Sequence, residues 1–211
     1  MTAAHIHETI LDKDVPKTYY QFLEVAVREL LIEKGVITAD DIRRSVEDMD
    51  SRGPEQGAQV VAHAWVDLEF KKSLLLDASS AVKTLGIDIG PLNLLVLENT
   101  SKVHNLIVCT LCSCYPRWLL GLPPDWYKSR EYRSRAVREP REVLREFGTE
   151  IPNEVEVRVH DSTADLRYLV LPKRPESTGH LNEEQLAALV KRDTMIGVTA
   201  VHPPVSSVFY T

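Results

Sequence analysis

The hydrophobic positions near the start of the chain recur at helical spacing. Apolar residues spaced i, i+3, i+4, i+7 and i+8 form one face of a predicted helix, namely Leu23, Ala26, Val27, Leu30 and Leu31. Gly35 suits the end of this helix, and Thr38 with Asp41 has the spacing of a capping box that begins a second one. Because two helices bury little apolar surface by themselves, we expect residues 1–52 to form a tail and a helical arm that packs on something else.

Further along the chain, helical patterns give way to strand patterns and return. Helices are predicted over residues 54–65, 70–76, 79–85, 125–135, 140–147 and 183–190, with Asp67 and Asn182 as caps. Strands are predicted over residues 94–97, 103–108, 155–159 and 166–171. The fold class is therefore α+β, an N-terminal helical arm followed by a small sheet packed with helices. We expect a central domain over residues 53–200 and a C-terminal tail over residues 201–211.

Composition and charge exclude several classes of protein. The 211 residues carry a net charge of -6, and the arginine-rich stretch 130–145 is interleaved with Glu131, Glu139 and Glu142. A solvated or interfacial helix face suits this stretch better than a nucleic-acid patch, so we expect no nucleic-acid partner. No apolar run is long enough to cross a bilayer, and the N-terminus lacks the pattern of a secretory signal. We therefore expect a cytoplasmic protein without a membrane partner.

The three cysteines of the chain lie within six residues, as Cys109, Cys112 and Cys114 directly after the predicted strand 103–108. A secreted scaffold would instead use an even number of widely spread cysteines. Structural zinc sites and iron-sulfur clusters usually take four protein ligands, so both are one ligand short here. His104 could fill the gap, but its position on the incoming strand favours a core histidine.

The spacing of Cys112 and Cys114 allows a different metal site. Two thiolates bracket the backbone amides of Ser113 and Cys114, and deprotonation of both amides would give a planar set of two nitrogens and two sulfurs. Cys109 could then approach from one axial side and leave the opposite side open. Amide deprotonation needs a strong Lewis acid, which favours trivalent cobalt or iron over zinc. An open position on such an ion can polarise a substrate or activate water.

The segment from Val108 to Pro116 resembles the metal motif of the nitrile hydratase α subunit. Colinear segments elsewhere also resemble that family, namely Leu31–Gly35, Trp65–Lys72, Glu98–Thr100, Gly121–Trp126, Tyr132–Arg135, Val137–Arg141, Leu171–Pro175 and Met195–Val198. The likeness covers roughly residues 20 to 200. It implies the hydration of a nitrile to its amide by residues 53–200, with a β-type partner subunit completing a hetero-oligomer.

The resemblance also implies roles for the residues of the loop. Cys109, Cys112, Ser113 and Cys114 would bind a low-spin trivalent metal, with Cys112 and Cys114 oxidised to cysteine sulfinic and cysteine sulfenic acid. Cys114 and Ser113 would be catalytic, and the attacking oxygen would come from Cys114 or from water. Threonine at Thr110 accompanies non-corrin cobalt(III) in the family, whereas serine there accompanies iron(III).

Two departures from the family pattern keep other functions open. The segment 86–93 lacks the glutamine that helps to shape the substrate pocket in the family, which indicates an altered pocket. Arg117 and Trp118 stand where the family often has Trp-Pro. With an arginine at this position, the chain resembles the metal-binding γ subunit of thiocyanate hydrolase. One alternative is therefore a thiocyanate hydrolase subunit. Another is a metal-carrying subunit that is inactive without its partners.

Overall fold

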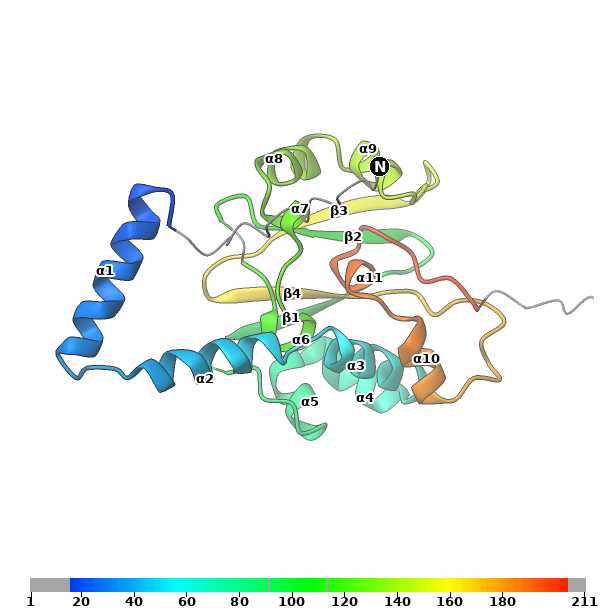
Figure 1. Ribbon diagram of the computed structural model, residues 1–211. Coiled ribbons are helices and arrows are strands. Elements are labelled where there is room, and N and C mark those ends of the chain that lie inside the picture. The colour runs from blue at the N-terminus through cyan, green and yellow to red at the C-terminus, as the bar shows by residue number, and fades with distance from the viewer. Residues whose placement is uncertain (1–15, 91, 113, 205–211) are drawn as a thin grey trace, which may run out of the picture. The chain divides into compact units, whose positions relative to one another are not determined.

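The computed structural model describes residues 16–90, 92–112 and 114–204 (Figure 1). Contacts divide the chain into two compact units, Met1–Asp48 and Met49–Thr211. The division falls inside helix α2 (Ala39–Asp50), shortly before the expected end of the arm at residue 52. Most of the expected N-terminal tail and residues 205–211 of the expected C-terminal tail lie outside the described residues.

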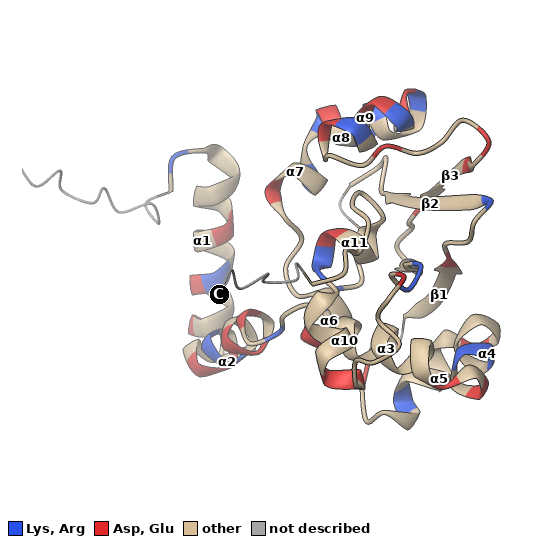
Figure 2. Cartoon of the chain, turned by 90° about the vertical axis from the view of Figure 1, so that its right-hand side faces the viewer, with Lys and Arg blue, Asp and Glu red and all other residues tan. Residues whose placement is uncertain are grey.

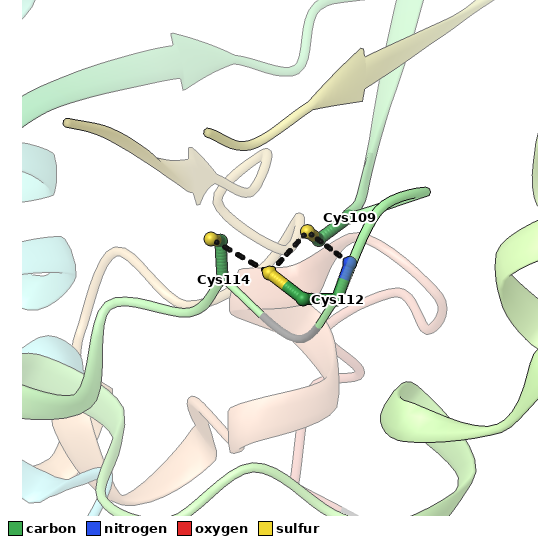
Figure 3. A group of neighbouring side chains, drawn as sticks. All are labelled: Cys109, Cys112 and Cys114. Carbon is green, nitrogen blue, oxygen red and sulfur yellow. Dashed lines mark hydrogen bonds between the residues drawn. The ribbon is translucent and has the colours of Figure 1, made fainter. Parts of the chain in front are cut away.

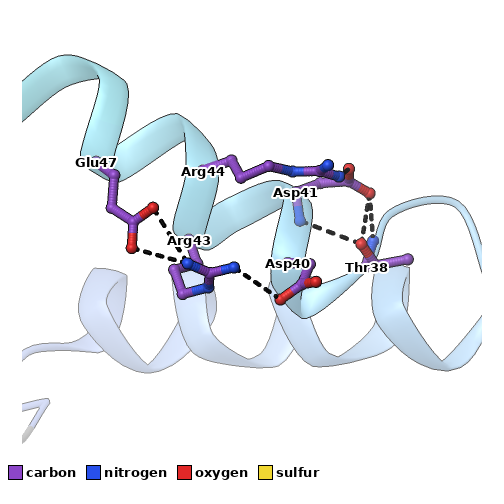
Figure 4. A network of polar contacts seen from close by, with 6 residues as sticks. All are labelled: Thr38, Asp40, Asp41, Arg43, Arg44 and Glu47. Carbon is purple, nitrogen blue, oxygen red and sulfur yellow. Dashed lines mark hydrogen bonds and ion pairs between the residues drawn. The ribbon is translucent and has the colours of Figure 1, made fainter.

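The first unit contains the two helices predicted from the sequence. Helix α1 (Tyr19–Glu33) begins with a capping box between Thr18 and Gln21, which the sequence analysis did not identify. Before α2, the Thr38 amide donates to Asp41 at 2.9 Å and the Asp41 amide donates to Thr38 at 3.1 Å (Figure 4). This reciprocal pair confirms the predicted second capping box. Among the described residues of these helices none is buried, and the predicted apolar face of α1 is exposed except at Leu31, which is half-buried.

Three helices open the second unit: α3 (Glu55–Val66), α4 (Leu68–Leu76) and α5 (Ala78–Thr84). The Asp67 carboxylate accepts the amides of Glu69 and Phe70 at 2.8 and 2.9 Å, which confirms it as the cap of α4. Helix α5 begins one residue earlier than predicted, because Asp77 accepts the Ser80 amide at 3.0 Å and serves as its cap. Helices α4 and α5 thus each begin at an aspartate whose side chain accepts free amides of the first turn, whereas α3 follows Pro54 and has no side-chain cap.

The predicted small sheet is two separate parallel ladders. Strand β1 (Asn93–Glu98) pairs with β4 (Leu166–Leu171), and β2 (Val103–Val108) pairs with β3 (Glu156–Asp161). Parallel pairing needs a long crossover, and the cysteine loop with the helices that follow it provides the crossover between β2 and β3 (Figure 1). The register places Asp161 opposite Val108. The last residue of β3 therefore lies beside the point where the cysteine loop leaves β2.

Short helices fill the rest of the second unit. They are α6 (Arg117–Leu120), α7 (Asp125–Lys128), α8 (Arg130–Arg138), α9 (Pro140–Glu146), α10 (Glu183–Leu189) and α11 (Arg192–Ile196). The continuous helical stretch predicted over residues 125–135 is wrong, because Ser129 is extended and caps α8 by accepting the Tyr132 amide. Arginines are interspersed with acidic residues along α8 and α9 (Figure 2), and Arg135 pairs with Glu139 and Glu146.

The core of the second unit surrounds the two ladders. Its fully buried side chains come from both ladders and from the helices, and include Leu106, Ile107, Leu169, Leu171, Tyr127, Leu144 and Met195. Gly197 has a φ of +91°, and a Cβ there would lie 2.1 Å from the carbonyl oxygen of Asn105. A side chain at this position would therefore collide with the backbone of β2. Among the described residues, no helix is long and apolar enough to span a membrane.

Candidate metal centre

Three cysteine side chains converge on the loop that follows β2 (Figure 3). The Cys112 sulfur lies 3.4 Å from the Cys109 sulfur and 3.2 Å from the Cys114 sulfur. The Cys112 amide also donates to the Cys109 sulfur at 3.2 Å, which folds the loop back on itself. Cys109 and Cys114 are buried, whereas Cys112 is exposed. Ser113, predicted as a ligand and a catalytic residue, lies outside the described residues.

The sulfur spacing fits one metal with ligands near right angles. A metal that binds thiolate sulfur at about 2.3 Å holds two sulfurs about 3.3 Å apart at a right angle and about 3.8 Å apart at a tetrahedral angle. The two sulfur–sulfur separations in this structure, 3.4 and 3.2 Å, lie closer to the first value. The three sulfurs are therefore close enough to bind one ion as neighbouring ligands.

Two buried tyrosines hold the backbone on either side of the cluster. Tyr127 of α7 donates its hydroxyl to the carbonyl oxygen of Cys114 at 2.9 Å. Tyr132 of α8 donates its hydroxyl to the carbonyl oxygen of Ile107 at 2.6 Å. Burial raises the pKa of both phenols well above the usual value, so both remain hydrogen-bond donors at any physiological pH. The sequence analysis missed both residues, because their partners are distant or lie in the backbone.

Thr110, the residue after Cys109, is held from two directions. Its amide and its hydroxyl donate to the two carboxylate oxygens of Asp161 at 2.9 and 2.5 Å. Its carbonyl oxygen accepts from Arg133 of α8 at 3.3 Å. Neither Asp161 nor Arg133 was singled out from the sequence as a residue of the site. In the sequence, Asp161 follows a predicted strand and Arg133 lies in a predicted helix, and neither position indicates a contact with the loop. The register of β2 with β3 is what places Asp161 beside it.

Electrostatics keep Cys114 protonated while no metal is bound. Burial first, and then the neighbouring Cys112 and Cys109 sulfurs, together raise the pKa of the Cys114 thiol to about 12, against a smaller opposing effect of Arg167. A metal that binds here must therefore displace a proton. Arg167 of β4 is a positive charge near this sulfur that the sequence analysis did not identify.

His104 lies away from the sulfur cluster, and Arg117 is exposed to solvent. His104 is at the opposite end of β2, about 16 Å along the strand from Cys109. Its Nε2 lies 2.7 Å from the carbonyl oxygen of Gly197, and burial lowers its pKa, so it is a neutral core histidine. Arg117 begins α6 and is exposed. In the altered segment 86–93, Gly90 approaches the ring of Trp118.

Comparison with known proteins identifies the family. The family model described as nitrile hydratase, alpha chain, matches residues 18–199. The chain belongs to the nitrile hydratase alpha-chain family. The matched region contains the three-cysteine cluster, so the chain is an alpha-type, metal-binding subunit of this enzyme family, as the motif predicted.

Individual nitrile hydratases and one related enzyme are similar over most of their length. The low-molecular-weight cobalt-containing nitrile hydratase subunit alpha of Rhodococcus rhodochrous is 51% identical over 85% of this chain and 87% of its own. The thiocyanate hydrolase subunit gamma of Thiobacillus thioparus is 44% identical over 89% and 82%. A solved double mutant of the Fe-type nitrile hydratase from Comamonas testosteroni Ni1 has a TM-score of 0.82 at 39% identity, covering 90% of this chain and 94% of that one. The predicted α+β fold of this nitrile hydratase subunit is confirmed.

Proposed function

We propose that this subunit supplies the metal centre at which a nitrile is hydrated to its amide, and that the metal is non-corrin cobalt(III). The observation that carries the proposal is the group of three sulfurs, spaced 3.4 and 3.2 Å about Cys112, on one loop of a chain of this family. Thr110 and the cobalt-containing relatives support cobalt. The similarity to an Fe-type enzyme makes iron(III) the alternative.

The proposal assigns a role to each residue of the loop. Cys109, Cys112, Cys114 and the backbone of Ser113 hold the ion, and Cys112 and Cys114 carry sulfinic and sulfenic oxygens. The bound ion supplies the Lewis acidity that polarises the nitrile. An oxygen from oxidised Cys114 or from water would add to the nitrile carbon. If the oxygen came from Cys114, a water would replace it, so that in either case the overall reaction adds one water across the carbon–nitrogen bond. Ser113 keeps the catalytic role that the family resemblance implies.

The partner and the organisation of the chain are part of the same proposal. Cys112 is exposed and Leu111 beside it is 88% exposed, so the loop reaches the surface of this subunit. A β-type subunit covering this surface would exclude water and complete the pocket for a small nitrile. Residues 1–52 would serve as an arm, residues 53–200 as the catalytic domain and residues 201–211 as a tail. A cytoplasmic location suits three cysteines that form no disulfide with one another.

The test is a turnover assay on the chain purified with its co-expressed β-type subunit. Benzonitrile and acetonitrile are offered, and amide formation is measured by chromatography for the wild type and for Cys112→Ser. Ser101→Ala, an exposed turn residue at the other end of β2, is the control. We expect amide from the wild type and the control and none from Cys112→Ser. Equal amide formation by Cys112→Ser would contradict the proposal.

Thiocyanate hydrolysis is a second candidate, favoured by one specific residue. Arg117 stands three positions after Cys114 as the exposed first residue of helix α6, and the thiocyanate hydrolase gamma subunit is 44% identical. The same preparation is therefore given thiocyanate, and release of ammonia and carbonyl sulfide is measured. Release from thiocyanate without amide from either nitrile would replace the first proposal by this one. Assay of the metal-loaded chain alone tests whether it is inactive without its partner.

A further inference from the structure

The end of β3 lies against the start of the cysteine loop. In the parallel register Asp161 is opposite Val108, the last residue before Cys109, and the Ser162 amide extends the ladder by donating to the Val108 carbonyl at 2.7 Å. The backbone of β3 therefore fixes the position of the Asp161 Cα relative to the first metal-binding cysteine. This placement owes nothing to the local sequence around the cysteines, because β3 is some fifty residues further along the chain.

Both oxygens of the Asp161 carboxylate accept hydrogen bonds from a single residue of the loop. Oδ1 accepts the amide of Thr110 at 2.9 Å, and Oδ2 accepts its hydroxyl at 2.5 Å. The γ-methyl group of a threonine restricts rotation about χ1, which helps to keep the hydroxyl directed at the carboxylate. The contact is exposed at the surface, so its effect is chiefly to select one loop geometry.

The restrained residue lies between two of the sulfurs. Thr110 follows Cys109 directly and precedes Cys112 by two residues, and Arg133 holds its remaining backbone polar group, the carbonyl oxygen, at 3.3 Å. With its amide, hydroxyl and carbonyl all engaged, Thr110 cannot rotate without breaking at least one of these bonds. The path from Cys109 to Cys112, whose sulfurs lie 3.4 Å apart, therefore starts from a fixed direction.

We propose that Asp161 is a positioning residue for the metal centre: by holding the amide and hydroxyl of Thr110, it sets the spacing of Cys109 and Cys112 for metal binding. The inference rests on the proposed metal centre and adds a residue to it. Groups that orient metal ligands typically change metal affinity by about 10- to 100-fold when they are removed. An aspartate suits this task because its two acceptors match the two donors of Thr110, whereas asparagine offers only one acceptor.

The experiment measures Co(II) affinity of the full, reduced chain under anaerobic conditions, by competition with a chelator. The sulfur-to-cobalt absorption band is recorded with it. Asp161→Ala is compared with Asp165→Ala, an exposed aspartate of the β3–β4 connection whose side chain has no contact recorded in the described structure. We expect Asp161→Ala to lower the affinity about 10- to 100-fold and to shift the absorption band. Asp165→Ala should match the wild type in both readouts.

A second pair of variants separates positioning from folding. Thr110→Val removes the hydroxyl but keeps the branched side chain, and it should lower Co(II) affinity in the background of Asp161 but not in that of Asp161→Ala. The urea midpoint of the metal-free chain should be the same for wild type, Asp161→Ala and Asp165→Ala. The inference would be overturned if Asp161→Ala bound Co(II) with wild-type affinity, or if the effects of Asp161→Ala and Thr110→Val were additive. A fall in the urea midpoint of Asp161→Ala would also overturn it. A wild-type chain that binds no Co(II) would instead overturn the proposed metal centre itself.

Discussion

Replacement of Tyr127 by phenylalanine tests whether the buried tyrosines support the cysteine loop. The Tyr127 ring is completely buried, and its hydroxyl donates to the Cys114 carbonyl at 2.9 Å. Tyr127→Phe removes this donor, so the carbonyl oxygen of Cys114 loses its hydrogen bond from the tyrosine hydroxyl. Loss of one partner of a buried hydrogen bond costs about 1–3 kcal/mol in the free energy of unfolding. For a chain of this size, each kcal/mol corresponds to roughly 2–4 °C in Tm.

The neighbouring Tyr115 provides a matched control. Its ring packs edge-on against that of Tyr127 with centroids 5.2 Å apart, and its hydroxyl is buried without a hydrogen-bond partner among the described residues. Tyr115→Phe removes the same atom from the same cluster but breaks no recorded hydrogen bond. It should therefore be neutral or stabilising, because a buried polar group without a partner is itself unfavourable.

The assay is urea unfolding of the metal-free, reduced chain, followed by tryptophan fluorescence. We expect Tyr127→Phe to lower the free energy of unfolding by about 1–3 kcal/mol and Tyr115→Phe to leave it unchanged or raise it. Tyr132→Phe, which loses the 2.6 Å bond to the Ile107 carbonyl, should resemble Tyr127→Phe. Equal stability of the Tyr127 and Tyr115 variants would refute the reasoning.

Two further predictions concern the core behind the site. Gly197→Ala should lower the free energy of unfolding more than Gly86→Ala, as measured by urea unfolding. Both glycines have a positive φ, in which an alanine is unfavourable by about 1–2 kcal/mol. Only at Gly197 would the added Cβ also meet a backbone atom, the carbonyl oxygen of Asn105 at 2.1 Å. Equal costs would show that β2 moves aside. Burial lowers the pKa of His104, so in acid the unfolded chain binds more protons at this residue than the folded chain does. The contribution of neutral His104 to stability is therefore fully present above about pH 6.5, the unfolded pKa, and is lost as the pH falls towards the folded pKa. His104→Gln should flatten this dependence between pH 7 and 5.5 and leave the contribution of His160, whose pKa is also lowered by burial; an unchanged slope would contradict this reasoning.

Local signals explain which parts of the fold were predictable. Asp67 and the pair Thr38 and Asp41 act on amides within three residues, so their caps could be read from spacing alone. Helices α6 and α11 were missed, since four and five residues are too few to show a helical period. Ser129 was missed as a break because polar residues on both sides continue the helical composition. The strands were recognised, but periodicity carries no information on which strands pair.

The same division applies to the site. The spacing of Cys109, Cys112 and Cys114 predicted a shared metal because neighbouring residues on one loop must lie close together. Asp161 and Tyr127 could not be found this way, because their places depend on the pairing of β2 with β3 and on the packing of α7. The residues that we propose to carry the chemistry were therefore visible in the sequence, whereas those that contact the loop from distant elements required the structure.

The central claim is that the loop from Cys109 to Cys114 holds trivalent cobalt with oxidised cysteines. The most direct test is metal analysis of the purified complex, combined with mass spectrometry of the peptide that contains these residues. The account predicts cobalt in an equimolar amount to the chain, with oxygen added at Cys112 and at Cys114 but not at Cys109. Zinc together with unmodified cysteines would contradict it.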